Sequence, residues 1–419
     1  MCAHVNEQAG FPRLPRVAVV THWFPKPSET FVYDELAALA NLGVPLSVFT
    51  LYGPWRGRVS AAMPATFCPV TRLGCRAAGR VLQDAVRAFG TNAAARNLWR
   101  HVPCRKWSDW EMAGENLWAF VCGFSLARRL AGRFDFIYAP WANGPATAAW
   151  TASRLTGIPF GFSAWAGDVF PPDGALADKI AAGAFVRSPC RTFLPHLQLH
   201  AGSHAHKVHV LYAVIDSHRS ELARALAGPP WHLLALGRFV AKKGFDVLLR
   251  ACALLRRDGF DFRLTLAGDG PQAARLQRLA RSLGLQDRVT FPGFIPRDQT
   301  AQLFRGTDLF IMPSVVDRAG DRDGIPTVIL EALLHGLPVI ATAVGGIGEA
   351  IRDGETGCLV PPADPATLAA AVRRFAADPA AARAMAVRGR EWVRQEFDSP
   401  TNARKLLDLI VAGTERRNG

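Results

Sequence analysis

The chain has 419 residues, a length typical of two or three domains, and its 49% hydrophobic content is enough for substantial cores. Eight cysteines occur without a C-x-x-C pair, which indicates neither a zinc site nor a disulfide framework, and unpaired cysteines are typical of a reducing compartment. No apolar run suits a membrane-spanning helix or a signal peptide, so we expect a cytoplasmic protein, free or peripheral on the inner face of the membrane.

The first half of the chain alternates short β-branched runs with amphipathic stretches. A strand is expected at residues 16–21, followed by the loop HWFPKPSET and a helix through Leu39. Further strands are expected in the segments GVPLSVFT, FDFIYAP, IPFGFSA and KVHVLY. Strands that alternate with helices predict a parallel sheet covered by helices.

Positive charge is concentrated in residues 56–133, although the whole chain already carries a net charge of +14. This segment holds thirteen Lys and Arg against four Asp and Glu, and its tryptophans are Trp99, Trp107, Trp110 and Trp118. Such a composition suits an anionic membrane surface or a nucleic acid. The alternative is a solvated Arg-rich face with Trp in the core, and both interpretations stay open. No nucleic-acid-binding module matches, so no nucleic-acid partner is expected.

The second half repeats the strand–helix alternation. Strands are expected in WHLLALG, FRLTLAGDGP, RVTFPGF, DLFIMPS, PVIATAVGG and GCLVPP. Asp364 and Asp378 each precede a proline, a pattern typical of a helix N-cap. The fold class is therefore α/β, with two doubly wound Rossmann-like domains that face one another across a cleft. Ligands of such sheets bind at the carboxyl ends of the strands.

The expected domain boundaries follow from this alternation and from a polar stretch that ends in Gly-Pro-Pro. The expected parts are a first domain over 1–217, a linker over 218–230, a second domain over 231–390, and C-terminal helices over 391–419 that pack back toward the first domain.

Two cations, Arg238 and Lys243, directly follow the first strand of the second half and precede a helix. This position lies at the carboxyl edge of the sheet, where two cations and a glycine-bearing turn would suit a diphosphate. The alternative is a pair of solvated loop cations.

Residues 321–349 read DRDGIPTVILEALLHGLPVIATAVGGIGE and place seven residues between Asp323 and Glu331. A helix is expected from about Thr327, and the unpaired N–H groups of its first turn favour an anion. Gly324 lets the backbone approach a ligand closely. Glu331, one turn further, can accept hydrogen bonds from a ribose diol, while Asp323 can bind the hydroxyls of a second sugar. The combination suits a nucleotide-sugar.

These segments carry a family resemblance. GRFVAKKGFD, LAGDGP, VTFPGFIP and DGIPTVILEALLHGLPVIATAVGGIGE closely resemble the retaining glycosyltransferases of family 4, which have the GT-B fold. WFPKPSETFVYDELAAL resembles members that build exopolysaccharide, capsule or colanic-acid-like polymers. The resemblance covers most of the chain and is strongest from Trp231 to Pro361.

The resemblance implies that the first domain, over 1–217, is the acceptor side and that the second, over 231–390, binds the nucleotide-sugar. It also implies a role for each motif. Glu331 would bind the ribose, Arg238 and Lys243 the diphosphate, and Asp323 the donor sugar, although the family usually has Glu at that position. The other implied donor contacts are Gly324, Ile325, Pro326 and Thr327 at the helix start, Phe294 beside the base, and Ser28, Glu29 and Thr30 in the first-strand loop.

One residue of the family pattern is missing. Many relatives carry a His after the strand in IPFGFSAWAGDVF; this position falls at Trp165, and a second common His falls at Gly167. Either activity is lost, or the site has changed, with Trp165 packed on a sugar face and Asp168 supplying the polar contact. His22 is a second possible replacement.

The implied reaction moves a sugar from a nucleoside-diphosphate sugar to an acceptor hydroxyl with retention of configuration. The implied acceptor is a saccharide or a lipid-linked saccharide in surface polysaccharide synthesis, and neither a metal ion nor a cofactor is expected. Alternatives are a nucleotide-sugar 2-epimerase and a catalytically weakened nucleotide-sugar-binding protein at the membrane.

Overall fold

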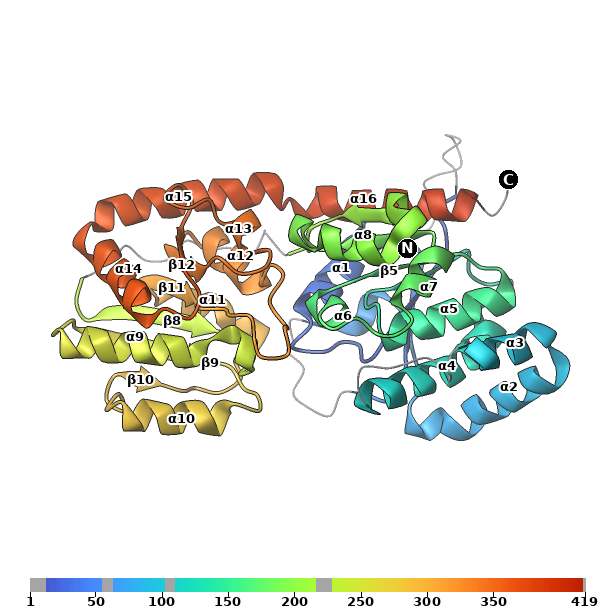
Figure 1. The fold of residues 1–419 in the computed structure, drawn as a ribbon. Coiled ribbons are helices and arrows are strands. Elements are labelled where there is room, and N and C mark those ends of the chain that lie inside the picture. The colour runs from blue at the N-terminus through green and yellow to red at the C-terminus, as the bar shows by residue number, and fades with distance from the viewer. Residues whose placement is uncertain (1–12, 55–62, 102–109, 216–227, 417–419) are drawn as a thin grey trace.

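The protein forms two α/β domains that lie side by side (Figure 1), as described by a computed structural model. The structure describes residues 13–54, 63–101, 110–215 and 228–416. The predicted linker over 218–230 lies mostly outside these residues. Each domain holds one parallel sheet with helices on both faces, which confirms the predicted fold class.

The first domain contains a seven-stranded parallel sheet in the order β3-β2-β1-β4-β5-β6-β7. Its strands are β1 (Val17–Thr21), β2 (Leu46–Thr50), β3 (Val70–Arg72), β4 (Phe136–Ala139), β5 (Phe160–Ser163), β6 (Phe185–Ser188) and β7 (Val208–Val210). The central strands β1, β4, β5 and β6 are buried throughout, as expected for a sheet covered on both faces. Strands β3 and β6 were not among the strands expected from the sequence.

The helices of this domain are α1 (Thr30–Asn41), α2 (Ala78–Thr91), α3 (Ala93–His101), α4 (Trp110–Leu130), α5 (Gly144–Thr156), α6 (Ala166–Val169), α7 (Leu176–Ala182) and α8 (Leu194–Ala201). Helices α2, α3 and α4 form most of the basic segment, and α2 and α3 lie at the outer end of the domain (Figure 1). Gly123 lets α4 approach α5, because a Cβ there would lie 2.4 Å from the Cβ of Thr151.

The tryptophans of the basic segment differ in burial. Trp110 is 93% exposed, whereas Trp118 is half-buried and donates from its indole Nε1 to the carbonyl of Leu51 over 2.8 Å. The side chain of Trp99 and all of Trp107 lie outside the described residues. The interpretation that places tryptophans of this segment in the core therefore fits Trp118. The interpretation that the segment forms a surface for an anionic partner fits Trp110. Among the described helices, none combines the length and apolar character needed to cross a membrane.

The second domain contains a six-stranded parallel sheet in the order β10-β9-β8-β11-β12-β13. Its strands are β8 (Trp231–Leu236), β9 (Phe262–Ala267), β10 (Val289–Thr290), β11 (Leu309–Met312), β12 (Val339–Thr342) and β13 (Cys358–Val360). Its helices are α9 (Phe245–Arg257), α10 (Ala273–Ser282), α11 (Arg297–Arg305), α12 (Thr327–Leu334), α13 (Ile347–Ala350), α14 (Pro365–Ala377) and α15 (Pro379–Glu396). Both predicted N-caps are confirmed, because Asp364 and Asp378 accept hydrogen bonds from the first turns of α14 and α15.

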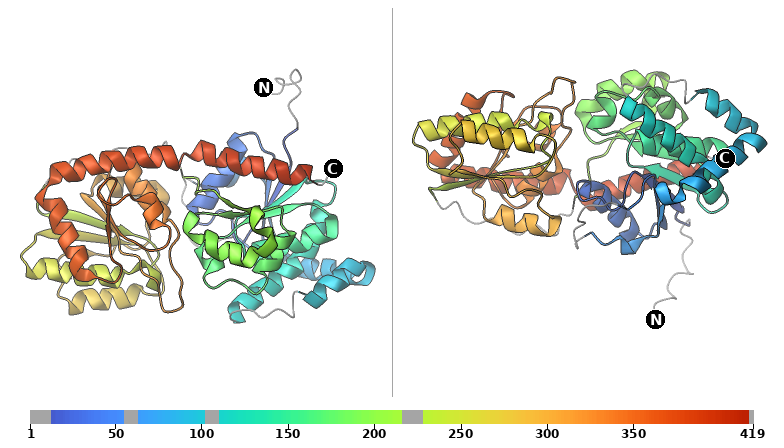
Figure 2. Two further views of the ribbon diagram at one scale, coloured as in Figure 1. Left: turned by 45° about the horizontal axis from the view of Figure 1, so that its top comes forward. Right: turned by 90° about the horizontal axis from the view of Figure 1, so that it is seen from below.

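The last helix, α16 (Ser399–Glu415), leaves the second domain and lies along the first, as both Figure 1 and the left view of Figure 2 show. Its Leu406 and Ile410 pack into the same core as Val17 and Phe136. Gly413 permits this packing, because a Cβ there would lie 2.7 Å from the Phe136 ring. The end of the chain thus joins the two domains.

Candidate functional site

The carboxyl edges of the two sheets face one another. The loop after β11 contacts the loops after β5 and β6, where the Arg322 guanidinium lies 4.5 Å from the centre of the Phe170 ring. A Cβ on Gly324 would lie 3.3 Å from the ring of Phe193, so the same loop also closely approaches the 3₁₀ turn Arg191–Phe193 that follows β6. The predicted ligand-binding ends of the strands are therefore opposed across the interface between the domains.

Lys243 and Asp323, predicted from separate motifs, form an ion pair at this edge. The Lys243 Nζ lies 3.0 and 2.9 Å from the two carboxylate oxygens of Asp323, which is buried. The Ser314 hydroxyl donates to the same carboxylate over 2.6 Å. A charged hydrogen bond of this kind fixes both side chains. The predicted phosphate-binding cation and the predicted sugar-binding acid are therefore direct neighbours.

A glycine sets the position of Lys243. The 3₁₀ turn Ala241–Lys243 ends at Gly244, whose φ is +62°, and a Cβ there would lie 1.9 Å from the carbonyl oxygen of Pro313. Only glycine fits, so the turn packs directly on the loop that follows β11. Arg238 lies two residues after β8 and is exposed. Both predicted cations are thus at the carboxyl edge.

Glu331 lies one turn inside α12, which begins at Thr327 after Pro326, as predicted. The surrounding α12 side chains are buried, and burial raises the pKa of Glu331 to about 7. The Arg297 guanidinium opposes this rise and the Asp34 carboxylate adds to it. In the part of the chain that the structure describes, the Glu331 carboxyl makes no hydrogen bond, so its oxygens are available to hydroxyl groups.

Arg297 and Asp34 form an ion pair between the domains that the sequence did not indicate. The two guanidinium nitrogens of Arg297, in α11, donate to the two carboxylate oxygens of Asp34, in α1, each over 2.6 Å. Their side chains are 13% and 10% exposed. Because 263 positions separate them, no local pattern could have found the pair.

The remaining predicted donor contacts lie at the same two edges. Ser28 is exposed, Glu29 is the buried N-cap residue of α1 and pairs with Lys26, and Thr30 begins the helix. Across the interface, Phe294 follows β10 and is 44% exposed. These positions agree with the predicted ones, whereas the contacts to a donor stay predictions.

Trp165 and Asp168 are engaged in local structure. The Asp168 carboxylate is buried and accepts hydrogen bonds from the backbone N–H groups of Trp165, over 2.9 Å, and of Asn143, over 3.2 Å. Burial raises the pKa of Asp168 to about 7. The Trp165 indole donates to the Pro140 carbonyl over 2.8 Å. This geometry gives Asp168 a capping role at the start of α6, and its predicted contact with the donor sugar stays a prediction.

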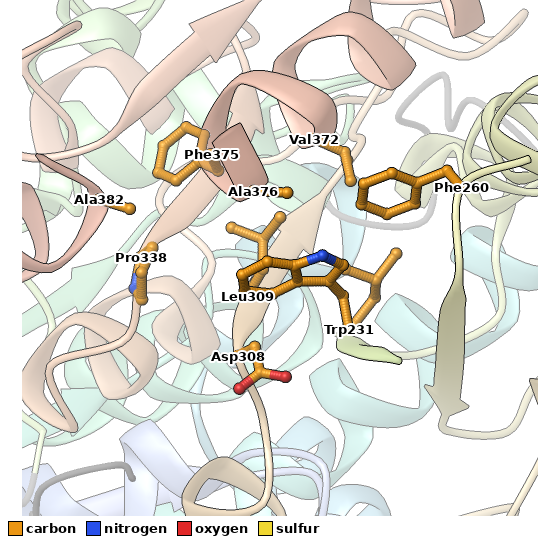
Figure 3. Close-up of a pocket in the computed structure, with 10 residues that line it drawn as sticks. Trp231, Phe260, Asp308, Leu309, Pro338, Val372, Phe375, Ala376 and Ala382 are labelled. Carbon is orange, nitrogen blue, oxygen red and sulfur yellow. The ribbon is translucent and has the colours of Figure 1, made fainter. Parts of the chain in front are cut away.

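A small pocket occurs at the opposite edge of the second sheet (Figure 3). It is lined by residues from the beginnings of β8 and β11 and by α14 side chains, among them Trp231, Leu309 and Phe375. Its lining is almost wholly apolar, and it lies away from Lys243, Asp323 and Glu331. We therefore assign it to packing between the sheet and α14.

Residues 221–392 match the family model described as glycosyl transferases group 1, a span that holds the Lys243–Asp323 pair and Glu331. Over these residues the chain is similar to the group 1 glycosyltransferases. The match agrees with the resemblance to glycosyltransferases that the motifs of the second half carry, whereas membership of family 4 and retention of configuration stay predictions.

Curated relatives of the group 1 domain include polysaccharide-synthesis proteins. The putative colanic acid biosynthesis glycosyltransferase WcaL of Salmonella typhimurium is 34% identical over 195 residues, which cover 46% of this chain and 47% of that protein. The amylovoran biosynthesis glycosyltransferase AmsK of Erwinia amylovora is 30% identical over 223 residues, or 53% of this chain and 55% of that protein. The chain spans about half the length of these curated relatives.

Solved structures agree along nearly the whole chain. Anabaena Alr3699/HepE, crystallised with UDP and glucose, has a TM-score of 0.69 at 17% identity and covers 95% of this chain and 99% of its own. Sucrose-phosphate synthase from Thermosynechococcus elongatus has a TM-score of 0.68 at 20% identity, covering 94% and 98%. At these identities the likeness establishes the fold, which is GT-B.

Proposed function

We propose that the chain is a retaining, metal-independent glycosyltransferase that moves a sugar from a nucleoside-diphosphate sugar to an acceptor hydroxyl in surface polysaccharide synthesis. The observation that carries the proposal is the pair of acids on α12 and its preceding loop. Asp323 is held by Lys243, and Glu331 presents a carboxyl without a hydrogen-bond partner among the described residues.

Each side chain has a chemical role in this proposal. Glu331 accepts hydrogen bonds from the ribose hydroxyls, and Arg238 and Lys243 bind the diphosphate. As the bond to the sugar breaks, negative charge grows on the departing phosphate, where these cations stabilise it. The first turn of α12 adds its N–H groups to the same anion. The departing phosphate oxygen accepts the proton of the attacking hydroxyl, so no separate base is required.

The names of the relatives support the proposed pathway class. Colanic acid and amylovoran are the polymers named for WcaL and AmsK, and HepE was crystallised with UDP and glucose. We extend from these names to a nucleotide-sugar donor and to an acceptor that is a saccharide, either lipid-linked or free. The exposed Trp110 and the basic segment support a peripheral position on an anionic membrane.

A test of the proposal incubates the full chain with a panel of nucleotide sugars and lipid-linked saccharides and follows transfer by mass spectrometry. We expect transfer with wild type and loss of transfer in Glu331→Gln. Glu355→Gln serves as the matched control, because Glu355 is an exposed turn residue of the same domain.

Two results would replace the proposal by an alternative. Nucleotide-sugar binding without transfer or hydrolysis would support the catalytically weakened binding protein. Conversion of the donor sugar to its 2-epimer without an acceptor would support the epimerase.

A further inference from the structure

One arginine of the second domain is held in place by an acid of the first. The Arg297 guanidinium, at the start of α11, donates from both terminal nitrogens to the two carboxylate oxygens of Asp34 in α1. It also lies 6.0 Å from the centre of the Tyr33 ring. Two parallel hydrogen bonds fix the plane of a guanidinium, so Asp34 determines the direction in which this cation points.

Helix α11 packs against the end of α12. The rings of Phe304, in α11, and His335, the residue after α12, have centres 4.8 Å apart. Arg297 precedes Phe304 by seven residues and Glu331 precedes His335 by four, so each charged residue shares a helix face with one of these rings. Both helices follow strands of the same parallel sheet and begin at its carboxyl edge. Arg297 and Glu331 therefore lie toward the same end of this contact.

The charges of these residues act on one another. Burial raises the pKa of Glu331 to about 7, and of the charged groups that modify this pKa, Arg297 lowers it and Asp34 raises it. The Glu331 carboxyl nevertheless makes no hydrogen bond among the described residues. Arg297 thus attracts Glu331 from a distance, while its terminal N–H groups donate to Asp34.

Removal of the Asp34 carboxylate would leave Arg297 without this anion in a mostly buried position, because the Arg297 side chain is only 13% exposed. A buried cation that loses its partner is strongly destabilising. The guanidinium would therefore turn to Glu331, the carboxyl whose ionisation it already favours. An ion pair between Arg297 and Glu331 would occupy the oxygens that ribose hydroxyls need as acceptors.

We propose that Asp34 is a positioning residue for nucleotide binding, which holds Arg297 away from Glu331 and so keeps the ribose-binding carboxyl available. The proposal rests on the proposed glycosyltransferase function and makes nucleotide binding in the second domain depend on the docking of the first. When the domains are in contact, Asp34 binds the cation and Glu331 can accept hydroxyl groups. When they separate, Arg297 blocks Glu331.

The test measures the binding of UDP and GDP by calorimetry to wild type, Asp34→Asn, Arg297→Met and the variant that carries both substitutions. Asp34→Asn removes the charge and keeps the size of the side chain. Arg297→Met is the matched control, because it breaks the same ion pair between the domains but leaves no cation that can reach Glu331. If the ion pair only joined the domains, all three variants would bind the nucleotide equally.

We expect Asp34→Asn to bind nucleotide about tenfold more weakly than wild type, the effect of one lost hydrogen bond to a charged group. Arg297→Met and the double variant should bind more tightly than Asp34→Asn does, because removal of the cation frees Glu331 again. Asp34→Ser, which also removes the carboxylate, takes the place of Asp34→Asn if that variant does not fold.

A second measurement requires no nucleotide. Because the pKa of Glu331 is raised above its ordinary value of 4.5, wild type loses stability as the pH rises from 4.5 to about 7. In Asp34→Asn, an ion pair with Arg297 would lower this pKa, so the loss should become smaller. Urea unfolding of Asp34→Asn with and without Glu331→Gln, at a series of pH values, measures the change.

Equal nucleotide affinities of Asp34→Asn and Arg297→Met would overturn the proposal, and so would an unchanged contribution of Glu331 to the pH dependence of unfolding in Asp34→Asn. The proposed function fails by a different result. It would be contradicted if neither nucleotide nor any nucleotide sugar bound wild type, whereas the unfolding measurement would still decide whether Asp34 holds Arg297 away from Glu331.

Discussion

Glu331→Gln should stabilise the fold in a pH-dependent way while it removes nucleotide binding. Burial raises the pKa of Glu331 to about 7 from an ordinary value of 4.5. Between these two values the unfolded chain ionises Glu331 and the folded chain keeps it protonated, so the wild type loses stability as the pH rises. Gln has no such cost, because it does not ionise.

The expected magnitude follows from the two pKa values. The difference between the two pKa values corresponds to a decrease of about 3 kcal/mol in the free energy of unfolding of the wild type, if Glu331 is fully buried. Since the Glu331 side chain keeps some contact with water, we expect about 2 kcal/mol. The gain of Glu331→Gln over wild type should therefore grow by this amount from below pH 4.5 to above pH 7, and then stay constant.

Urea unfolding at a series of pH values measures this gain. Asp323→Asn is the matched comparison, because it removes a carboxylate that Lys243 and Ser314 bind and should destabilise the fold. A free-energy difference between Glu331→Gln and wild type that does not change with pH would refute a raised pKa. Undiminished binding of free nucleotide by Glu331→Gln would refute the ribose role.

Three further predictions concern charge. Arg238→Ala and Lys243→Met should each weaken the binding of a nucleoside diphosphate, measured by calorimetry, by about 1.5–3 kcal/mol. Lys243→Met should also lower the midpoint of thermal unfolding, because it leaves the Asp323 carboxylate buried without its cation. If both variants bind the nucleoside diphosphate as tightly as wild type does, the two cations do not bind the diphosphate. Asp34→Asn should weaken the contact between the domains and increase the radius of gyration measured by small-angle scattering. An unchanged radius of gyration would show that the Asp34–Arg297 ion pair does not hold the domains together. If residues 56–133 bind membranes, the protein should sediment together with anionic vesicles at low salt, and less of it should do so as the salt concentration rises. If none of the protein sediments with the vesicles at low salt, the basic segment is a solvated face that does not bind membranes.

The sequence predicted the fold class because most strands are apolar runs bounded by turns. It missed β6 because that strand carries Arg187, which is fully buried. Arg187 pairs with Glu35 from α1 and donates to the carbonyls of Leu211 and Tyr212. A buried charge is tolerated only where such partners exist, and they lie far away in the sequence. It missed β3 because a strand of only three residues at a sheet edge, two partly buried and one exposed, has little hydrophobic pattern.

The positions of the residues proposed to bind the donor were predictable from the sequence, whereas the contacts between the domains were not. Local spacing places three of these residues at the carboxyl edge, because Arg238 and Lys243 follow strand β8 and Glu331 follows the start of helix α12. The Asp34–Arg297 pair depends on how two separate domains meet, which no periodicity records.

The two acids of the motif have opposite surroundings, and this difference supports different roles. Asp323 lies before α12, where Lys243 neutralises it and Ser314 donates to it, so its position is fixed before any ligand arrives. Glu331 lies inside α12 among apolar side chains, and its carboxyl has no such partner in the described structure. Two hydroxyl donors would favour the ionised carboxylate and would offset its burial cost. A ribose diol supplies two hydroxyls, so nucleotide binding should lower the pKa of Glu331 and release a proton near neutral pH.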